Sequence, residues 1–198
     1  MTVESELPIP AATVVLVREN NAASELEVLL LRRNQELVFL GGHWVFPGGR
    51  IDPGDFDASG SELEYQAALS AAVRETREEA GIEIDPARLI HTAHWTTPPR
   101  LPRRFSTWFF LCAIEQAVDV VVDNDEILEY RWISPGRALD EARAQKLSLP
   151  RPTRVTLEDI SVYSDLSTLL QHMQQREIRV FPSDSPYYRP AEMGYLPD

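Results

Sequence analysis

The sequence contains a single cysteine, Cys112, so the 198-residue chain can form no internal disulfide. It also lacks any apolar run of about 18 residues, the length that a membrane-spanning helix needs. The opening MTVESELPIP has neither the basic nor the apolar region of a secretory signal peptide. We therefore expect a protein of the reducing cytoplasm, in which Cys112 packs as an ordinary core side chain.

Positive charge is also scarce, with 19 Lys and Arg against 31 Asp and Glu and a formal net charge of -12. This balance argues against a nucleic acid polymer or an anionic membrane as partner. It leaves room for a small anionic substrate, because a bound cation and a few local arginines can reverse the sign inside a cleft. Hydrophobic residues make up 43% of the chain, and we expect one domain over residues 1–198.

A helix is expected over residues 66–80, because good helix formers fill this segment and no Gly or Pro interrupts it. Gly81 is well placed as its left-handed cap. Within the helix Glu75, Glu78 and Glu79 are spaced i, i+3 and i+4, so their carboxylates share one face. Like charges at this spacing repel by a few tenths of a kcal/mol per pair. One interpretation is a solvated acidic face.

A second interpretation comes from the glycine turn upstream, Pro-Gly-Gly at 47–49. Such a turn lets the backbone approach a ligand, and Gly49 can offer its carbonyl. Carboxylate and carbonyl oxygens suit Mg²⁺ or Mn²⁺, which commonly bridge to substrate phosphates. A bound cation would also remove the repulsion. This pattern predicts a metal site made by Gly49, Glu75, Glu78 and Glu79.

Gly49, Asp55 and the run RETREEAGI at 74–82 together resemble the nudix box, G-x5-E-x7-R-E-U-x-E-E-x-G-U. The second half matches at each fixed acidic, basic and glycine position. Asp55 replaces the first glutamate of the box, and 18 residues rather than seven separate it from Arg74. The additional residues, near 56–65, include Asp-Ala-Ser-Gly-Ser and are expected to form a surface loop.

The resemblance implies an α/β protein, a nudix-type α/β/α sandwich with a mixed sheet. It also implies a pyrophosphohydrolase that acts on phosphorus anhydrides with Mg²⁺ or Mn²⁺ as cofactor. In that family the box glutamates divide between metal ligand and general base. We expect Glu78 and Glu79 as principal ligands, Glu75 as ligand or base, and Arg74 as the residue that orients a glutamate through a salt bridge.

Nudix enzymes often add a carboxylate from beyond the box, and NDEILEYRW offers Glu126 and Glu129. We take Glu129 as the catalytic candidate, the alternative for either residue being a solvated acidic turn. Substrate-binding candidates are Arg50, beside the box, and Arg100, Arg104 and Phe105 of the proline-rich stretch TTPPRLPRRF. Prolines limit the entropy of a loop, so arginines there can be held to bind phosphate. A solvated basic loop is the alternative.

The remaining elements follow from local patterns. Strands are expected over 13–18 and 27–32 as a hairpin, and over 44–46, 89–95, 105–114 and 130–133. Helices are expected over 136–145 and 157–175, followed by an irregular tail from 178. His43, His91, His94 and His172 show no metal-ligand spacing and are expected to be structural. Tyr187 and Tyr188 are expected to pack on their own domain, with a homodimer seam as the alternative.

The expected function is hydrolysis of the diphosphate in a nucleoside diphosphate linked to another group, a small-molecule substrate. HWTTPPRLPRRFSTWFF is similar to a stretch in the nudix branch that includes acyl-coenzyme A diphosphatases, and LLLRRN and FPGGRID-x-x-D resemble diphosphatases of that cofactor. GGHWVFPGG lacks their upstream Gly-Gln-Val. We place coenzyme A or an acyl derivative ahead of ADP-ribose and NADH. A nudix module that senses a nucleotide without cleaving it is the alternative.

Overall fold

The computed structural model describes residues 7–20, 22–101 and 103–196, and it has the α/β architecture expected from the sequence. The strands are β1 (Ile9–Asn20), β2 (Glu25–Arg33), β3 (Trp44–Val45), β4 (Gly48–Arg50), β5 (Ile90–Thr96), β6 (Phe105–Ala113), β7 (Ile127–Ile133) and β8 (Arg179–Phe181). The helices are α1 (Pro53–Ser59), α2 (Glu64–Ala80), α3 (Pro135–Arg143), α4 (Arg151–Ile160), α5 (Leu166–Gln175) and α6 (Pro190–Met193). No helix within these described residues is long and apolar enough to span a bilayer.

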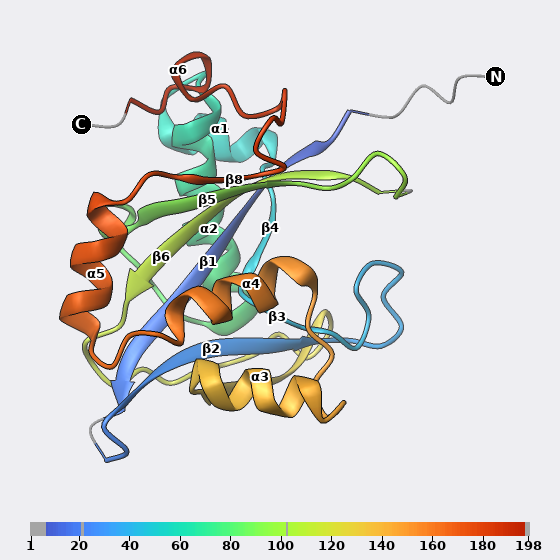
Figure 1. Ribbon diagram of the computed structural model, residues 1–198. Coiled ribbons are helices and arrows are strands. Elements are labelled where there is room, and N and C mark those ends of the chain that lie inside the picture. Colours follow the sequence, from blue (N-terminus) through green and yellow to red (C-terminus); the bar gives the residue numbers. More distant parts are fainter. Residues whose placement is uncertain (1–6, 21, 102, 197–198) are drawn as a thin grey trace.

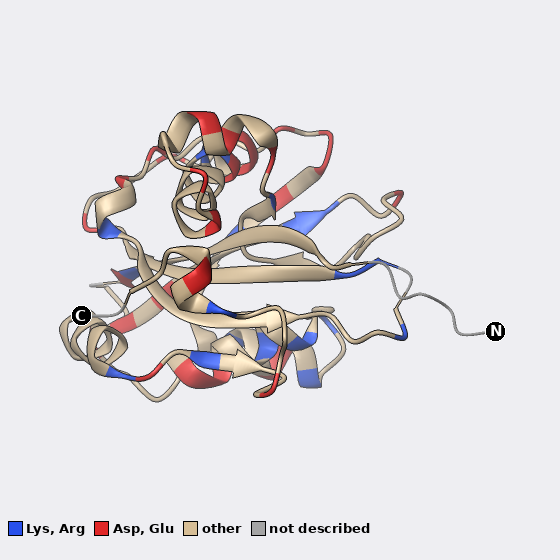
Figure 2. Ribbon diagram, turned by 90° about the horizontal axis from the view of Figure 1, so that it is seen from above, with Lys and Arg blue, Asp and Glu red and all other residues tan. Residues whose placement is uncertain are grey.

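The described strands form one mixed, eight-stranded sheet whose main path is β3-β2-β1-β6-β5-β8. β4 pairs with β1, and β7 pairs with β2. β1 runs parallel to β6, and β5 runs parallel to β8, whereas the other pairs are antiparallel. α1 and α2 lie behind the sheet in Figure 1, and α3, α4 and α5 lie in front of it. Figure 2 shows helices on both sides of the sheet from above, so the α/β/α sandwich is confirmed.

Strand β1 shows how the sequence builds two cores. Val15 and Val17 belong to the core beneath α3, α4 and α5, whereas Val14 and Leu16 belong to the core beneath α2. All four side chains are fully buried. Successive side chains of a strand point to opposite faces. A strand covered on both sides therefore needs the continuous apolar run that this sequence has, and β1 pairs with β2 as the expected hairpin.

Helix α2 matches the expectation closely. It begins two residues before the expected start at 66 and ends at Ala80, followed by Gly81 at φ 68°. The Gly81 N–H donates to the carbonyl of Arg77 at 2.9 Å and closes the last turn. The left-handed conformation explains why glycine stands here.

The expectation of a surface loop near residues 56–65 is wrong, because most of this segment is helical. Helix α1 continues to Ser59, and α2 already begins at Glu64. The side chains of Phe56 and Tyr65 are partly buried against the core beneath α2. Ser and Gly in the segment favoured a loop locally, but packing of α1 against α2 decides the outcome.

The single helix expected over 157–175 is also wrong, because it divides into α4 and α5 with a turn at 161–165 between them. The Asp165 carboxylate accepts the N–H of Thr168 at 2.8 Å and so starts a new helix. The tail after 178 is less irregular than expected. Strand β8 extends the sheet beside β5, where the rings of Trp95 and Phe181 stack at 3.8 Å.

Two expectations about single side chains are confirmed. Tyr188 packs on its own domain, with its ring centroid 4.7 Å from that of His94, and the guanidinium of Arg104 lies 5.3 Å from the centre of the Tyr187 ring. Cys112 is a buried free thiol, and burial raises its pKa. A thiol of this kind is a packing group rather than a nucleophile.

Candidate active site

Glu79 is the most deeply buried of the three box glutamates, with 5% of its surface exposed. Its carboxylate accepts the Gly48 N–H at 2.9 Å and lies 3.7 Å from the guanidinium of Arg33. Burial raises the pKa of Glu79 to about 8, and the nearby charge of Glu75 acts in the same direction. The Gly48 N–H and Arg33 oppose that shift. A buried carboxylate in this setting is stabilised by any cation that reaches it.

Gly48 and Gly49 allow close contacts on either side of β4. A Cβ on Gly48 would lie 2.4 Å from the carbonyl oxygen of Ala12 on β1, and a Cβ on Gly49 would lie 2.3 Å from Oε1 of Glu75. Both glycines belong to strand β4, so the turn expected at 47–49 is instead the start of a strand. The glycine pair therefore lets β4 touch its neighbouring strand and the box carboxylate at once.

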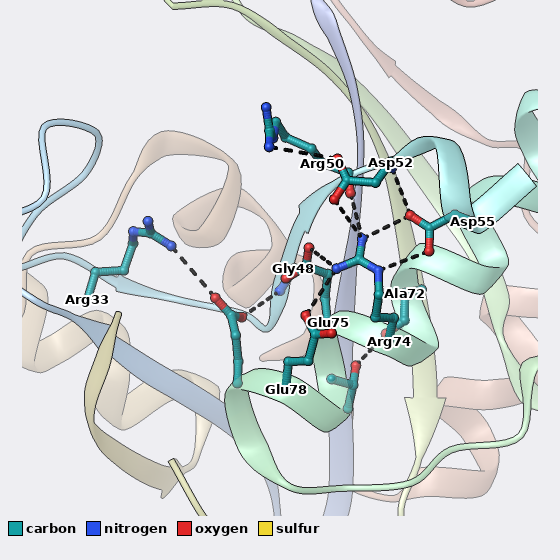
Figure 3. A network of polar contacts seen from close by, with 11 residues as sticks. Arg33, Gly48, Arg50, Asp52, Asp55, Ala72, Arg74, Glu75 and Glu78 are labelled. Carbon is teal, nitrogen blue, oxygen red and sulfur yellow. Dashed lines mark hydrogen bonds and ion pairs between the residues drawn. The ribbon is translucent and has the colours of Figure 1, made fainter. Parts of the chain in front are cut away.

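Arg74 is the centre of a polar network (Figure 3). Its Nε and Nη2 donate to Asp55 at 3.0 and 2.9 Å, and its Nη1 donates to Glu75 at 2.8 Å and Glu78 at 3.1 Å. Nη2 also donates to the carbonyl of Arg50 at 2.9 Å. The bonds to Asp55 raise the pKa of Arg74, so it stays charged. The geometry is what an orienting role for Arg74 requires, and it brings Asp55 back into the site despite the insertion.

Arg33 is a site residue that the sequence reasoning missed. Its guanidinium contacts Glu79 at 3.7 Å and Glu126 at 3.3 Å, and 16% of its side chain is exposed. Nothing in the local pattern LLLRRN distinguishes it from Arg32. The two arginines differ in the face of the sheet to which they point. Leu29 and Leu31 face the core beneath α2, and side chains of a strand alternate between its faces, so Arg33 faces α2 as well.

The structure does not bring Glu129 to the box glutamates. Glu129 pairs with Arg32 at 2.6 Å, and the neighbouring Arg131, two positions further along β7, binds Glu141 of α3. This strand face is therefore turned toward α3, away from α2. Glu126 is the carboxylate beyond the box that is linked to Glu79, through Arg33.

The substrate-binding candidates lie at one end of the sheet but do not form one cluster. Arg50 is exposed on β4, with its guanidinium 3.7 Å from Asp52. Phe105 opens β6 and pairs with Ile9, at the end of β1 where β4 also pairs. Arg104 is buried and donates from Nε to the carbonyl of Thr97 at 3.2 Å, a structural contact within the loop. Arg100 is exposed, and Pro102 of the same stretch lies outside the described residues.

The donor set fits a hard divalent cation in its chemistry, because each candidate ligand is an oxygen. Within residues 7–20, 22–101 and 103–196, however, no three acidic, histidine or cysteine side chains are gathered as a metal site. Glu75 and Glu78 turn to Arg74, and Glu79 turns to Gly48 and Arg33. Guanidinium groups thus neutralise the carboxylates in this arrangement. The observation in favour of a cation is Glu79, buried beside the charge of Glu75.

The sequence matches the family model of the NUDIX domain over residues 7–151. Among curated proteins, a nudix hydrolase of Caenorhabditis elegans is 28% identical over 190 residues, covering 78% of this chain and 61% of that protein. An acyl-coenzyme A diphosphatase, NUDT19 of Xenopus laevis, is 22% identical over 268 residues, covering 89% of this chain and 70% of that protein. The chain thus spans about two thirds of the length of these relatives.

Among solved structures, a NUDIX hydrolase from Alicyclobacillus acidocaldarius superposes with a TM-score of 0.74 at 24% identity. The match covers 83% of this chain and 96% of that one, and it shows the fold. The fold and the family match together define a nudix-type α/β/α protein. Its box glutamates lie on α2, and Gly48 and Gly49 lie on β4. The chain belongs to the NUDIX domain family.

Proposed function

We propose that this protein is a metal-dependent hydrolase that cleaves the diphosphate of a nucleoside diphosphate linked to another group, with coenzyme A or an acyl derivative as substrate. One observation carries the proposal: Glu79, buried and with a raised pKa, is held by a backbone N–H of the glycine strand beside Glu75. A carboxylate that is costly to bury and has a strongly shifted pKa marks a candidate functional site. The resemblance to an acyl-coenzyme A diphosphatase favours the substrate.

Glu75, Glu78, Glu79 and the carbonyl of Gly49 are the proposed ligands for Mg²⁺ or Mn²⁺. When bound, such an ion neutralises phosphate charge and acidifies a coordinated water. Arg74 keeps Glu75 and Glu78 on the same side of α2. Asp55 in turn fixes the plane of the Arg74 guanidinium through two bonds. This support orients the carboxylates before a substrate arrives.

A carboxylate must also accept the proton of the attacking water. Glu75 and Glu126 are the proposed bases, since both have contacts with the network around the box helix. Arg33 lies between Glu79 and Glu126 and supplies positive charge where phosphate oxygens would come. Arg50 and Arg100, both exposed, remain proposed contacts for the outer phosphates of the substrate.

The test is a panel of diphosphates incubated with the purified chain and Mg²⁺ or Mn²⁺. It includes coenzyme A, acyl-coenzyme A, ADP-ribose, NADH, nucleotide sugars and nucleoside triphosphates. We expect phosphorylated products only with metal, and most rapidly from the coenzyme A compounds. Glu79→Gln should lose about a hundredfold or more in kcat while remaining folded. Glu177→Gln, which changes an exposed glutamate in the segment between α5 and β8, is the control.

Faster cleavage of ADP-ribose or NADH than of the coenzyme A compounds would change the proposed substrate but leave the proposed reaction, diphosphate hydrolysis, unchanged. Tight binding of a nucleotide without cleavage of any compound, with either metal, would contradict an enzyme. It would favour the nucleotide-sensing module instead.

A further inference from the structure

The loop between β2 and β3, residues 34–43, presents apolar side chains to solvent, and we call it the apolar loop. Its centre reads Leu-Val-Phe-Leu at 37–40, and Val38 has 101% of its surface exposed. The three residues around Val38 are only partly buried. A fully exposed valine within a run of half-buried apolar residues leaves apolar surface in water, and apolar surface patches often mark contact sites.

The apolar loop is built to hold this conformation. Its two ends are joined where the Gly42 N–H donates to the carbonyl of Arg33 at 3.1 Å, and its base is joined to the β7 side where the Asn34 N–H donates to the carbonyl of Glu126 at 2.7 Å. A Cβ on Gly41 would lie 2.5 Å from the carbonyl oxygen of Leu37, so the loop is folded tightly on itself. The exposed side chains are thus presented by an ordered backbone.

The position of the apolar loop connects it to the candidate active site. It begins directly after Arg33, the residue that contacts Glu79 and Glu126. At its far side the ring of Phe39 lies 4.9 Å from the ring of Phe105. The loop therefore extends from the box glutamates to the beginning of β6.

A second loop projects from the same end of the sheet, between β5 and β6 (Figure 1). We call residues 97–101 and 103–104 the arginine loop. Leu101 is 45% exposed, Arg100 is exposed, and the guanidinium of Arg103 lies 5.9 Å from the centre of the Phe105 ring. Apolar and cationic side chains thus meet around Phe105.

We propose that the apolar loop and the arginine loop together bind the acyl arm of an acyl-coenzyme A substrate. Val38, Phe39 and Leu101 contact the acyl chain, and Arg100 and Arg103 face the phosphates of the same molecule. This inference rests on the proposed function and specifies which part of the substrate determines selectivity. A substrate made only of phosphates, sugars and a base would leave Val38 without a partner.

The charges favour this occupant. The chain carries a formal net charge of -12, yet the side chains beside the exposed apolar residues include two exposed arginines. An anionic molecule with a long apolar chain matches both features at once. Its scissile diphosphate would lie at the box glutamates, and the pantetheine arm that joins the diphosphate to the acyl group would carry the acyl chain to the ordered loop that starts at Arg33.

The experiment compares kcat/KM for octanoyl-coenzyme A and acetyl-coenzyme A, using the full chain with Mg²⁺ below the micelle concentration of either compound. We expect wild type to prefer the octanoyl compound about tenfold, the scale of discrimination that apolar contacts give. Val38→Asp should bring that ratio close to one. Val162→Asp changes another exposed valine, 76% exposed in the turn between α4 and α5, and should keep the wild-type ratio. Thermal unfolding confirms that each variant is folded.

A ratio near one in wild type, or a ratio unchanged in Val38→Asp, would overturn the acyl contact while coenzyme A cleavage still supports the proposed function. Failure to cleave any coenzyme A compound would overturn the proposed substrate and the acyl contact together. Sedimentation with phosphatidylcholine and phosphatidylserine vesicles tests whether the apolar loop binds the acyl chains of lipids instead. Vesicle binding lost in Val38→Asp, with no effect of chain length on cleavage, would assign the loop to a lipid surface and reject the proposal.

Discussion

Arg74 holds Asp55 through two parallel hydrogen bonds, Nε to Oδ1 at 3.0 Å and Nη2 to Oδ2 at 2.9 Å. These residues stand on either side of the insertion that separates the two halves of the box sequence. The additional residues complete α1, which begins at Pro53, and form the start of α2, so the insertion does not separate Asp55 from Arg74. The bidentate geometry is the strong form of an Arg–carboxylate contact.

Asp55→Ala should lower the free energy of unfolding by about 3 kcal/mol, because it leaves the partly buried Arg74 without its principal partner. The estimate is at the low end of the range for buried pairs, since 24% of the Arg74 side chain is exposed. Asp57→Ala removes an exposed aspartate from the same helix and should change stability by less than about 0.5 kcal/mol. Urea denaturation of both variants measures the difference. Equal effects would show that the Asp55 contact is not structural.

Gly49→Ala should reduce kcat about tenfold or more, because the new Cβ would lie 2.3 Å from Oε1 of Glu75 and displace that carboxylate. Gly54→Ala is the matched control, since a Cβ there meets nothing within 4 Å. Diphosphate hydrolysis with Mg²⁺ compares the two variants with wild type. Full activity in Gly49→Ala would mean that the position of Glu75 does not matter for the reaction.

The sequence was sufficient for features that depend on near neighbours. The helix over 66–80 and its Gly81 cap follow from helix propensity and from the conformational freedom of glycine. The buried strands were also recognisable, because a strand such as β1 is covered on both faces and so reads as a continuous apolar run.

Local sequence patterns do not predict which residues distant in the sequence pair in the fold. Arg33 meets Glu126 across 93 positions only because β2 and β7 are neighbours in the sheet, with a register shift beside Arg33. Without that register, Glu126 and Glu129 were indistinguishable. The break at 161–165 carries a local signal, because Asp165 caps α5 by accepting the N–H of Thr168. At the insertion, by contrast, α1 packs against α2, and these tertiary contacts outweigh local propensity.

His91 and His94, both buried on β5, should lower stability as pH falls below neutrality, whereas Glu79, whose pKa is raised to about 8, acts in the opposite direction. Burial lowers the pKa of His91 to about 3, with the charge of His94 acting in the same direction, and lowers the pKa of His94 to about 4. In the unfolded chain both groups titrate near 6.5. At these two histidines the unfolded state therefore binds more protons below pH 6.5, and their contribution to native stability decreases down to the folded pKa values.

At pH 5.5 the expected loss is about 1.4 kcal/mol for each histidine. Urea unfolding at pH 7.5 and 5.5 measures it in wild type, in His91→Phe and in His172→Gln, an exposed control. The change in the free energy of unfolding from pH 7.5 to 5.5 should be more favourable in His91→Phe than in wild type by about the contribution of one histidine. His172→Gln should behave like wild type. An identical pH dependence in all three proteins would show that His91 is not held neutral.

Glu126 and Glu129 offer the sharpest comparison between the structure and the sequence pattern. Glu126→Gln should lower kcat about a hundredfold if this carboxylate accepts a proton beside Glu79, the range expected for a general base. Glu129→Gln should lower it less than about threefold, because Glu129 pairs with Arg32 on the strand face turned toward α3. Both side chains are about half exposed and both pair with an arginine, so each serves as the other's control. Steady-state hydrolysis with saturating Mg²⁺ gives the two values. A larger loss in Glu129→Gln would place the reaction on the α3 side of β7, and the assignment of Arg33 and Glu126 to the site would then be wrong.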